Sequence, residues 1–198
     1  MTFSLKKAFP ASAVLAFAFT LFSCEKEMKA PVGGDGFQNF VIKAGEHDSG
    51  TNFQRMNTNK MNFVVVFDSS AVYKTKILAN QHDINKLYGM SDCGESDHHK
   101  KSVRLGWRWL KNRLEIHGYA YKNSEPKANS NIVTTVPLNK EIPMSIELRD
   151  SLYVFTVDGV TSELKRGCTG DGDGNKLYPY FGGDEMAPHD ITIKIKDL

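Results

Sequence analysis

The chain has 198 residues, of which 25 are basic and 23 are acidic, and its formal net charge is +2. This near balance argues against a nucleic-acid-binding protein, which would need a basic face. Hydrophobic residues make up 40% of the sequence, which suits one domain with a sizeable core, and a second domain is not expected.

The first residues follow the plan of a secretory signal peptide. Lys6 and Lys7 give a positive start, and an apolar stretch follows over residues 11–22. This stretch is too short for a membrane-spanning helix, which needs about 20 apolar residues. Removal of the peptide would take away both lysines and no acidic residue, so the mature chain would carry balanced charge.

The segment Leu21–Cys24 resembles the lipobox of bacterial lipoproteins. The resemblance implies cleavage after residue 23 and acylation of Cys24, which would anchor the chain to a membrane. Glu25–Glu27 is similar to the acidic export tags of Bacteroidota lipoproteins, so we expect the outer membrane, at its surface or its periplasmic face. The alternative is an ordinary secretory peptide with a chance cysteine. Residues 24–36 would form a flexible tether to a domain over 37–198.

The other two cysteines, Cys93 and Cys168, form an even pair in an oxidising compartment, which favours a disulfide. The bridge would close a loop of about 75 residues and stabilise the fold by roughly 4 kcal/mol. The alternative takes Cys93, His98 and His99 as metal ligands, although this set lacks a recognisable second pair.

Strand-like runs separated by turn signals fill the rest of the chain, and no stretch keeps a helical period over three turns. Asp158–Gly159 favours a two-residue hairpin with positive φ, and Lys111–Asn112 and Asp150–Ser151 are similar links. One short helical turn is allowed over residues 81–88. The predicted strands are Phe37–Lys43, Met61–Phe67, Val103–Trp109, Leu114–Tyr121, Ile132–Val136, Met144–Arg149, Leu152–Val157, Val160–Lys165 and Asp190–Lys196. We therefore predict an all-β fold, an antiparallel two-sheet sandwich or jelly roll in a single domain.

Alternation along these strands separates a core face from a polar and aromatic face. If the strands share one sheet, the second face would carry Arg104, Arg108, Glu115, His117, Tyr119, Tyr121, Glu147 and Arg149. Gly106 on the same face would leave room for a ligand or another backbone. Aromatic rings bind the apolar faces of sugars, and Arg and carboxylates hydrogen-bond hydroxyls or uronates, so such a face suits a glycan. The alternative is a solvent-exposed sheet merely decorated with Tyr and Arg.

Oxygen ligands at alternate positions, Asp171, Asp173 and Asn175, resemble the opening of an EF-hand calcium loop. Gly182 stands where the twelfth-position Glu is required, so the loop is not a complete EF-hand. Calcium would stiffen the loop beside Tyr178–Phe181, and the alternative is a Gly- and Asp-rich hairpin loop without metal. No other cofactor is expected.

Catalytic signatures are mostly missing. The sequence has no Gly-x-Ser-x-Gly, no His-Glu-x-x-His, no phosphate loop and no Glu-x-Asp-x-x-Glu of the jelly-roll glycosidases. Glu147–Arg149 faintly resembles a motif of jelly-roll alginate lyases, whose companion Gln-Ile-His is not found. In an enzyme, His117 or Tyr119 would act as the base, and Arg108 or Arg149 would hold the acid group.

Four stretches, Lys86–Gly89, Ser102–Trp107, Leu177–Glu185 and Pro188–Ile191, resemble a group of Bacteroidota lipoproteins with a jelly-roll, concanavalin-like domain. The group brings no established activity, so the resemblance implies compartment and fold. Bacteroidota display many surface lipoproteins that capture polysaccharides, which favours glycan binding by association.

The sequence therefore predicts a non-catalytic, lipid-anchored β-sandwich that binds a polysaccharide or oligosaccharide. The predicted binding residues are Arg104, Arg108, His117, Tyr119, Tyr121 and Tyr180. A polysaccharide lyase or hydrolase on the same face is one alternative, and a structural lipoprotein that binds another protein is the second.

Overall fold

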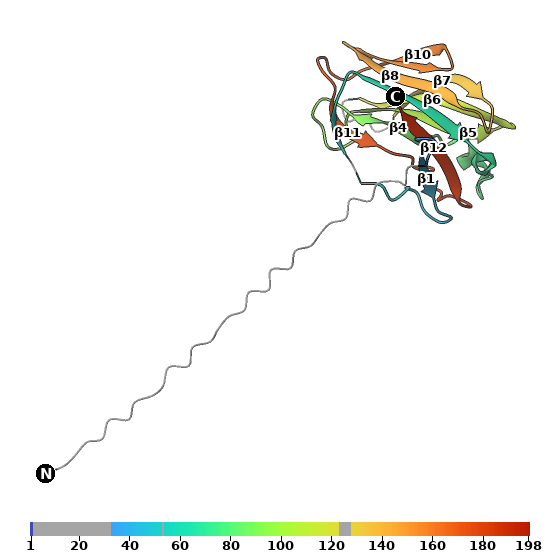
Figure 1. The fold of residues 1–198 in the computed structure, drawn as a ribbon, viewed down its shortest axis with the longest axis horizontal. Helices are drawn as coiled ribbons and strands as arrows, with labels where there is room; N and C mark the ends of the chain where they lie inside the picture. Colours follow the sequence, from blue (N-terminus) through green and yellow to red (C-terminus); the bar gives the residue numbers. More distant parts are fainter. Residues whose placement is uncertain (2–32, 53, 123–127) are drawn as a thin grey trace.

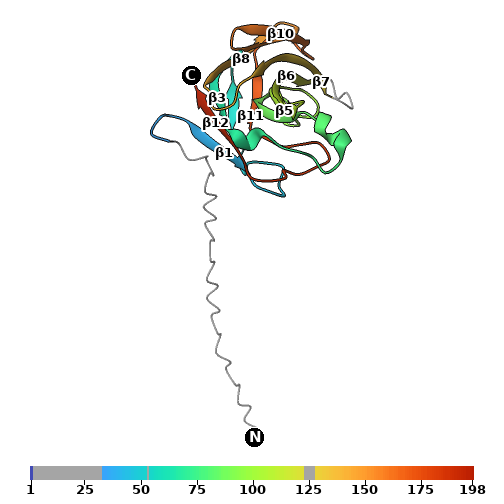
Figure 2. The same cartoon turned by 90° about the vertical axis from the view of Figure 1, so that its right-hand side faces the viewer.

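The computed structural model describes residues 1, 33–52, 54–122 and 128–198. The predicted signal peptide, Cys24 and most of the tether lie outside this part of the chain. The described residues form twelve strands in two six-stranded antiparallel sheets, stacked face to face around a single core (Figures 1 and 2). The predicted all-β, two-sheet sandwich is confirmed.

The first sheet, here called the supporting sheet, has the strand order β1-β12-β3-β8-β9-β10. Its strands are β1 (Gln38–Ile42), β12 (Ile191–Asp197), β3 (Lys60–Phe67), β8 (Ile142–Arg149), β9 (Leu152–Val157) and β10 (Val160–Lys165). Residues from opposite ends of the chain meet here, since β1 pairs with β12 at one edge, where the blue and red strands run side by side (Figure 2).

The second sheet, here called the site sheet, has the order β2-β11-β4-β5-β6-β7. Its strands are β2 (Arg55–Asn57), β11 (Asp173–Leu177), β4 (Asn85–Ser91), β5 (Ser102–Leu110), β6 (Arg113–Tyr121) and β7 (Asn129–Val136). Two short 3₁₀ helices, η1 (Ser69–Ala71) and η2 (Leu78–His82), lie in the connection from β3 to β4. No helix in the described residues is long and apolar enough to cross a membrane.

The core follows from strict alternation along the strands. In β12 the side chains of Ile191, Ile193 and Ile195 are buried, while those between them are partly exposed. From the site sheet, Trp107 is fully buried, and its ring lies 5.5 Å from that of Phe67, centroid to centroid. Aromatic rings from both sheets thus fill the space between them.

Two of the three predicted hairpin turns have positive φ at both residues, whereas in Asp150–Ser151 only Asp150 does, with φ of 37°. Asp158 and Gly159 link β9 to β10 with φ of 47° and 82°, and Lys111 and Asn112 link β5 to β6 with φ of 51° and 58°. Paired positive φ values match the right-handed twist of the flanking strands, so each turn fixes the register of its hairpin.

Three strands were not predicted: β2, β4 and β11. The helical turn predicted over residues 81–88 is wrong for most of that segment, because η2 ends at His82 and β4 begins at Asn85. Nearly every residue of β4 is buried, so it lacks the alternation that reveals a half-exposed strand. In β11, the Gly- and Asp-rich composition conceals the strand.

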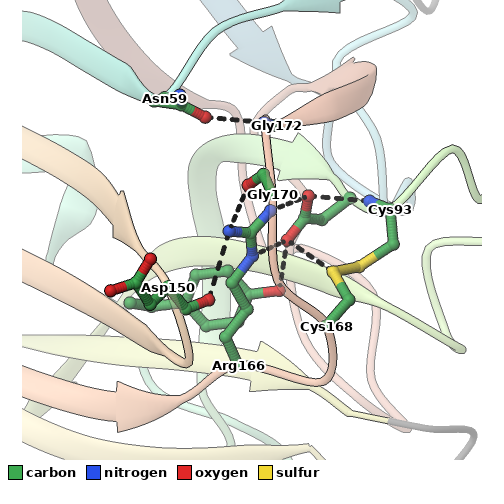
Figure 3. The surroundings of a disulfide bond; sticks show 9 residues. Asn59, Cys93, Asp150, Arg166, Cys168, Gly170 and Gly172 are labelled. Carbon is green, nitrogen blue, oxygen red and sulfur yellow. Dashed lines mark hydrogen bonds and ion pairs between the residues drawn. A yellow bond between two sulfur atoms is a disulfide. The ribbon is translucent and has the colours of Figure 1, made fainter.

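A buried ionic cluster lies beside the bond between Cys93 and Cys168, which the structure joins in the disulfide that the sequence favoured, with Cα atoms 6.3 Å apart (Figure 3). The Asp92 carboxylate accepts hydrogen bonds from Arg166 Nε at 2.7 Å, Arg166 Nη2 at 3.0 Å and the Tyr153 hydroxyl at 2.8 Å. The side chains of Asp92 and Arg166 are both fully buried.

Arg166 extends this cluster into the loop that precedes β11. Its Nη1 donates to the carbonyl oxygens of Gly170 at 2.7 Å and Asp150 at 3.3 Å (Figure 3). The alternative metal set around Cys93 is wrong, because its sulfur is bonded to that of Cys168. The cluster and the disulfide together fix the segment between β10 and β11 against the end of β4.

Candidate functional site

The outward face of the site sheet gathers the predicted residues of β5 and β6. In the register of this hairpin, Arg104 pairs with Tyr119, Gly106 with His117, and Arg108 with Glu115. Since paired residues point to the same side of a sheet, their side chains share the face turned away from the core. The face has two ends of different character.

One end of the face is filled by the protein's own polar contacts. Arg108 Nε donates to Glu115 Oε2 at 2.7 Å, Arg108 Nη1 donates to the His82 carbonyl oxygen at 2.7 Å, and His117 Nε2 lies 3.3 Å from Glu115 Oε2. Glu115 and His117 are each only 5% exposed. This end is closed and its charges are paired, so the prediction that Arg108 and His117 contact a ligand is not supported by this geometry.

The protonation states at the closed end follow from burial and charge. Burial opposes ionisation of Glu115, but the hydrogen bond and the charge of Arg108 outweigh it and lower the pKa of the carboxyl. Burial and the Arg108 charge also lower the pKa of His117, which Glu115 only partly offsets. The imidazole is therefore neutral near pH 7.

Gly106 does not leave space for a ligand. A Cβ at this position would lie 2.5 Å from Ile84 Cγ2 and 3.0 Å from the Asn85 carbonyl oxygen. The missing side chain accommodates the segment that leads into β4. Of the two roles predicted for Gly106, room for a ligand or for another backbone, the structure shows the second.

The other end of the face opens into a cavity of about 420 Å³. Its lining comes from three segments besides β5, and the lining residues are Asp48, Ser49, Gly50, Thr51, Asn52, His98, Arg104, Leu177, Tyr178, Pro179 and Tyr180. We call it the Arg104 pocket. A volume of this size falls within the range of ligand sites.

The wall of the Arg104 pocket is held by backbone pairing. Tyr180 N donates to the Lys86 carbonyl oxygen at 3.0 Å, and Lys86 N donates to the Tyr180 carbonyl oxygen at 2.8 Å. On its other side Tyr180 bridges to Asp48, and its ring stacks on His47 with centroids 5.2 Å apart and an interplanar angle of 11°. The predicted rim residue Tyr180 is thus part of an extension of the site sheet.

Two cations, Arg104 and Lys86, lie at this open end. Arg104 is 6% exposed, and burial lowers the pKa of its guanidinium to about 10. Lys86 Nζ donates to the Gly182 carbonyl oxygen at 2.7 Å and lies 5.3 Å from the ring centroid of Tyr119 and 5.6 Å from that of Tyr180. Burial and the charge of Arg104 lower the pKa of Lys86 to about 8.

Aromatic side chains continue from the pocket along β6. The rings of Tyr119 and Tyr121 lie 5.9 Å apart in an edge-on arrangement, and His99 packs against Tyr121 at 5.3 Å. Burial raises the pKa of Tyr119, so its hydroxyl keeps its proton. The open end therefore combines rings, hydroxyls and positive charge.

Sequence reasoning missed two residues of this site, Lys86 and His98. Lys86 lies on β4, which the hydrophobic pattern did not reveal. His98 reaches the pocket from the loop that joins β4 to β5, and burial together with the Arg104 charge lowers its pKa to about 4. Its neutral imidazole adds no charge at pH 7.

Glu147 and Arg149 are not on this face, and the prediction of a shared surface is wrong for both. They belong to β8 in the supporting sheet, where Arg149 Nε donates to Glu147 Oε1 at 2.8 Å. Arg149 cannot hold an acid group beside Tyr119 or His117, because the core of the sandwich lies between the two sheets.

The predicted calcium ligands have partners in the protein. Asp171 Oδ1 accepts from Asn59 Nδ2 at 2.8 Å, and Asp173 Oδ2 accepts from Arg55 Nη2 at 2.6 Å. The Asn175 backbone donates to Ser91 Oγ at 2.8 Å. The two carboxylates thus point to different partners, and calcium binding stays a prediction that this arrangement does not favour.

The chain matches no protein-family model, and no curated protein matches it either. Among solved structures it is similar to a β-glucanase of Bacillus licheniformis, with a TM-score of 0.53 and 10% identity over 83% of this chain and 78% of that one. It is also similar to the Crh5 transglycosylase in complex with NAG, with a TM-score of 0.53 and 11% identity over 86% of this chain and 74% of that one. A third similar structure is alginate lyase A1-II′ of polysaccharide lyase family 7, with a TM-score of 0.51 and 13% identity over 83% of this chain and 78% of that one. At identities this low, the structural similarity shows a shared jelly-roll fold and nothing more.

Proposed function

We propose that the protein is an exported, lipid-anchored glycan-binding protein, with Cys24 as the lipid attachment site and the outer membrane as its location. The lipobox-like segment at Leu21–Cys24 supports export and anchoring. The Arg104 pocket and the adjoining rings of Tyr119 and Tyr121 support glycan binding.

The observation that carries this proposal is the aromatic, partly open cavity on the outward face of the site sheet. Tyr178 and Tyr180 line it, and Tyr119 and Tyr121 extend it along β6. Tyrosine offers a flat apolar surface to a sugar ring and a hydroxyl that hydrogen-bonds sugar hydroxyls. A cavity of about 420 Å³ accommodates one or two sugar units of a longer chain.

The solved structures with a similar fold agree with this reading by association. They include a β-glucanase, a transglycosylase with bound NAG and a lyase that acts on alginate. A variant of that lyase with one histidine and one tyrosine replaced was solved in complex with substrate. A similar fold does not imply the same activity, so the function has to be argued from the residues of the pocket.

The test is affinity electrophoresis of the full-length chain in detergent, through native gels cast with a panel of neutral and acidic polysaccharides. We expect retardation by at least one polymer. Replacing Tyr119 and Tyr121 together with Ala should abolish it, because both rings leave the face. The matched control is Arg149→Ala on the opposite outer surface, which should migrate as the parent does. Normal retardation of the folded double variant, or free migration in every gel, would contradict the proposal; capture of another protein with no glycan would then favour an assembly role.

A lyase is the second candidate, and the pairing of Arg104 with Tyr119 favours it. A buried cation beside a protonated phenol could hold a uronate acid group, while the neutral imidazole of His98 takes the proton next to that group and the Tyr119 phenol protonates the departing glycosidic oxygen. In such a site Arg104 takes the role that the sequence assigned to Arg108 or Arg149. Formation of unsaturated products from a uronate polymer, lost in Tyr119→Phe, would establish the lyase; no product from any polymer would leave a binding protein.

A further inference from the structure

Arg104 is a buried charge without a counter-charge. Its side chain lines the pocket, its Nε is fully buried and has no hydrogen-bond partner, and no carboxylate forms an ion pair with it among the described residues. A buried guanidinium is strongly destabilising unless it is paired and hydrogen-bonded. Arg166 shows the ordinary solution in the same molecule, because Asp92 binds it through two oxygens.

Lys86 increases the positive charge at the same place. Arg104 and Lys86 lie close enough that the charge of Arg104 lowers the pKa of the ammonium. Lys86 contacts a carbonyl oxygen and two aromatic rings, and Asp83 is near enough to act on it without forming an ion pair. The protein thus places a second cation beside the one that lines the cavity, and among the described residues neither forms an ion pair, an arrangement that favours a bound anion.

The size and lining of the pocket indicate which class of anion it could bind. A cavity of about 420 Å³ is far larger than an isolated inorganic anion needs. Ser49, Thr51 and Asn52, whose side chains carry hydroxyl and amide groups, also line it, together with Tyr180. Such a lining suits sugar hydroxyls around one charged substituent.

We infer that the Arg104 pocket binds the anionic substituent, a carboxylate or a sulfate, of an acidic polysaccharide, with Arg104 as its direct hydrogen-bond donor and Lys86 as a second cation. This inference rests on the proposed glycan-binding function and names its ligand class. Arg104 lines the pocket and carries no counter-charge, so its guanidinium is the group placed to donate to the anion.

The experiment is calorimetric titration of the full-length chain in detergent with three oligosaccharides: oligomannuronate with carboxylates, a carrageenan oligosaccharide with sulfates, and a neutral laminarin oligosaccharide. We expect one anionic probe to bind at least about tenfold more tightly than laminarin oligosaccharide. Whichever anionic probe has the higher affinity shows whether the pocket prefers a carboxylate or a sulfate.

The decisive variant is Arg104→Met, which removes the charge and keeps much of the volume. It should weaken the preferred anionic probe at least about tenfold and change the neutral probe by less than about twofold. It should also unfold at an equal or higher urea concentration than the parent, because an unpaired buried charge is removed. Arg149→Met, an exposed arginine of the supporting sheet, is the matched control and should change neither affinity.

The outcomes separate the two proposals. Equal affinity for neutral and anionic probes, or an equal loss of both in Arg104→Met, would overturn the inference and leave glycan binding intact. Lower stability of Arg104→Met with unchanged selectivity would identify Arg104 as structural and would also overturn it. Failure of all three probes and of the polysaccharide panel would overturn glycan binding itself. Competition by free glucuronate, but not by glucose, tests selectivity in the unmodified chain.

Discussion

At the scale of single residues, Lys86 should make the proposed ligand binding depend on pH. Its ammonium faces Arg104, Tyr119, Tyr180, Asp83 and the Gly182 carbonyl, and its pKa is about 8, so it is protonated below that pH and loses its proton above it. The free energy of binding an anion should therefore be fully present near pH 7 and weaken as the pH rises through 8.

The measurement is affinity for the preferred acidic oligosaccharide between pH 6.5 and about 9.5, where the Arg104 guanidinium stays mostly charged because its pKa is about 10. Lys86→Arg should bind well and remove the fall, and Lys86→Met should bind weakly and also give a flat profile. A parent profile that stays level through pH 9 would contradict the role of Lys86.

A second residue-scale prediction concerns Asp92, the buried partner of Arg166. Asp92→Asn keeps the size of the side chain but leaves the guanidinium without its counter-charge, so the free energy of unfolding should fall by about 3–5 kcal/mol. Urea unfolding followed by fluorescence measures the change. Glu147→Gln, which breaks an exposed ion pair with Arg149, is the control and should have a far smaller effect. Equal midpoints for the two variants would show that the cluster is not stabilising.

At the scale of strands, the sequence predicted the elements in which apolar and polar residues alternate, and it missed β2, β4 and β11, which do not sustain that pattern. Alternation located β5 and β6, and the hairpin between them placed Arg104 opposite Tyr119. The same pattern cannot assign a strand to one of two sheets, which is why Glu147 and Arg149 were expected beside these residues. Local sequence also carries no signal for Lys86, since β4 is buried on both faces and Tyr180 approaches it only in the folded chain.

Close packing of β6 against the other sheet gives a third prediction. A Cβ at Gly118 would lie 2.6 Å from Cε2 of the core residue Phe155 and 2.8 Å from Oδ1 of the partly buried Asn131. Gly118→Ala should therefore destabilise the fold by about 1–3 kcal/mol through overpacking. Thermal unfolding checks this, with Gly34→Ala as the control because a Cβ there would contact nothing within 4 Å. A Gly118 variant as stable as the control would mean that the sheets separate to accept the methyl group.

At the scale of the whole molecule, the Cys93–Cys168 bridge joins segments 75 residues apart in the chain. A variant with both cysteines replaced by Ala lacks the bond that closes this long loop. Its free energy of unfolding should be lower by about 4 kcal/mol. Urea unfolding of the variant, and of the parent with and without reductant, measures this. Identical midpoints under all conditions would show that Asp92 and Arg166 suffice to hold these segments.

The backbone pairing of Tyr180 with Lys86 has a kinetic consequence. The pocket wall is an extension of a sheet, so its shape exists before any ligand arrives, and binding requires little ordering of the chain. Encounter should then be a simple one-step process whose association rate is similar for related oligosaccharides. Differences in affinity among glycans, and among variants of the pocket, should be expressed mainly as differences in residence time.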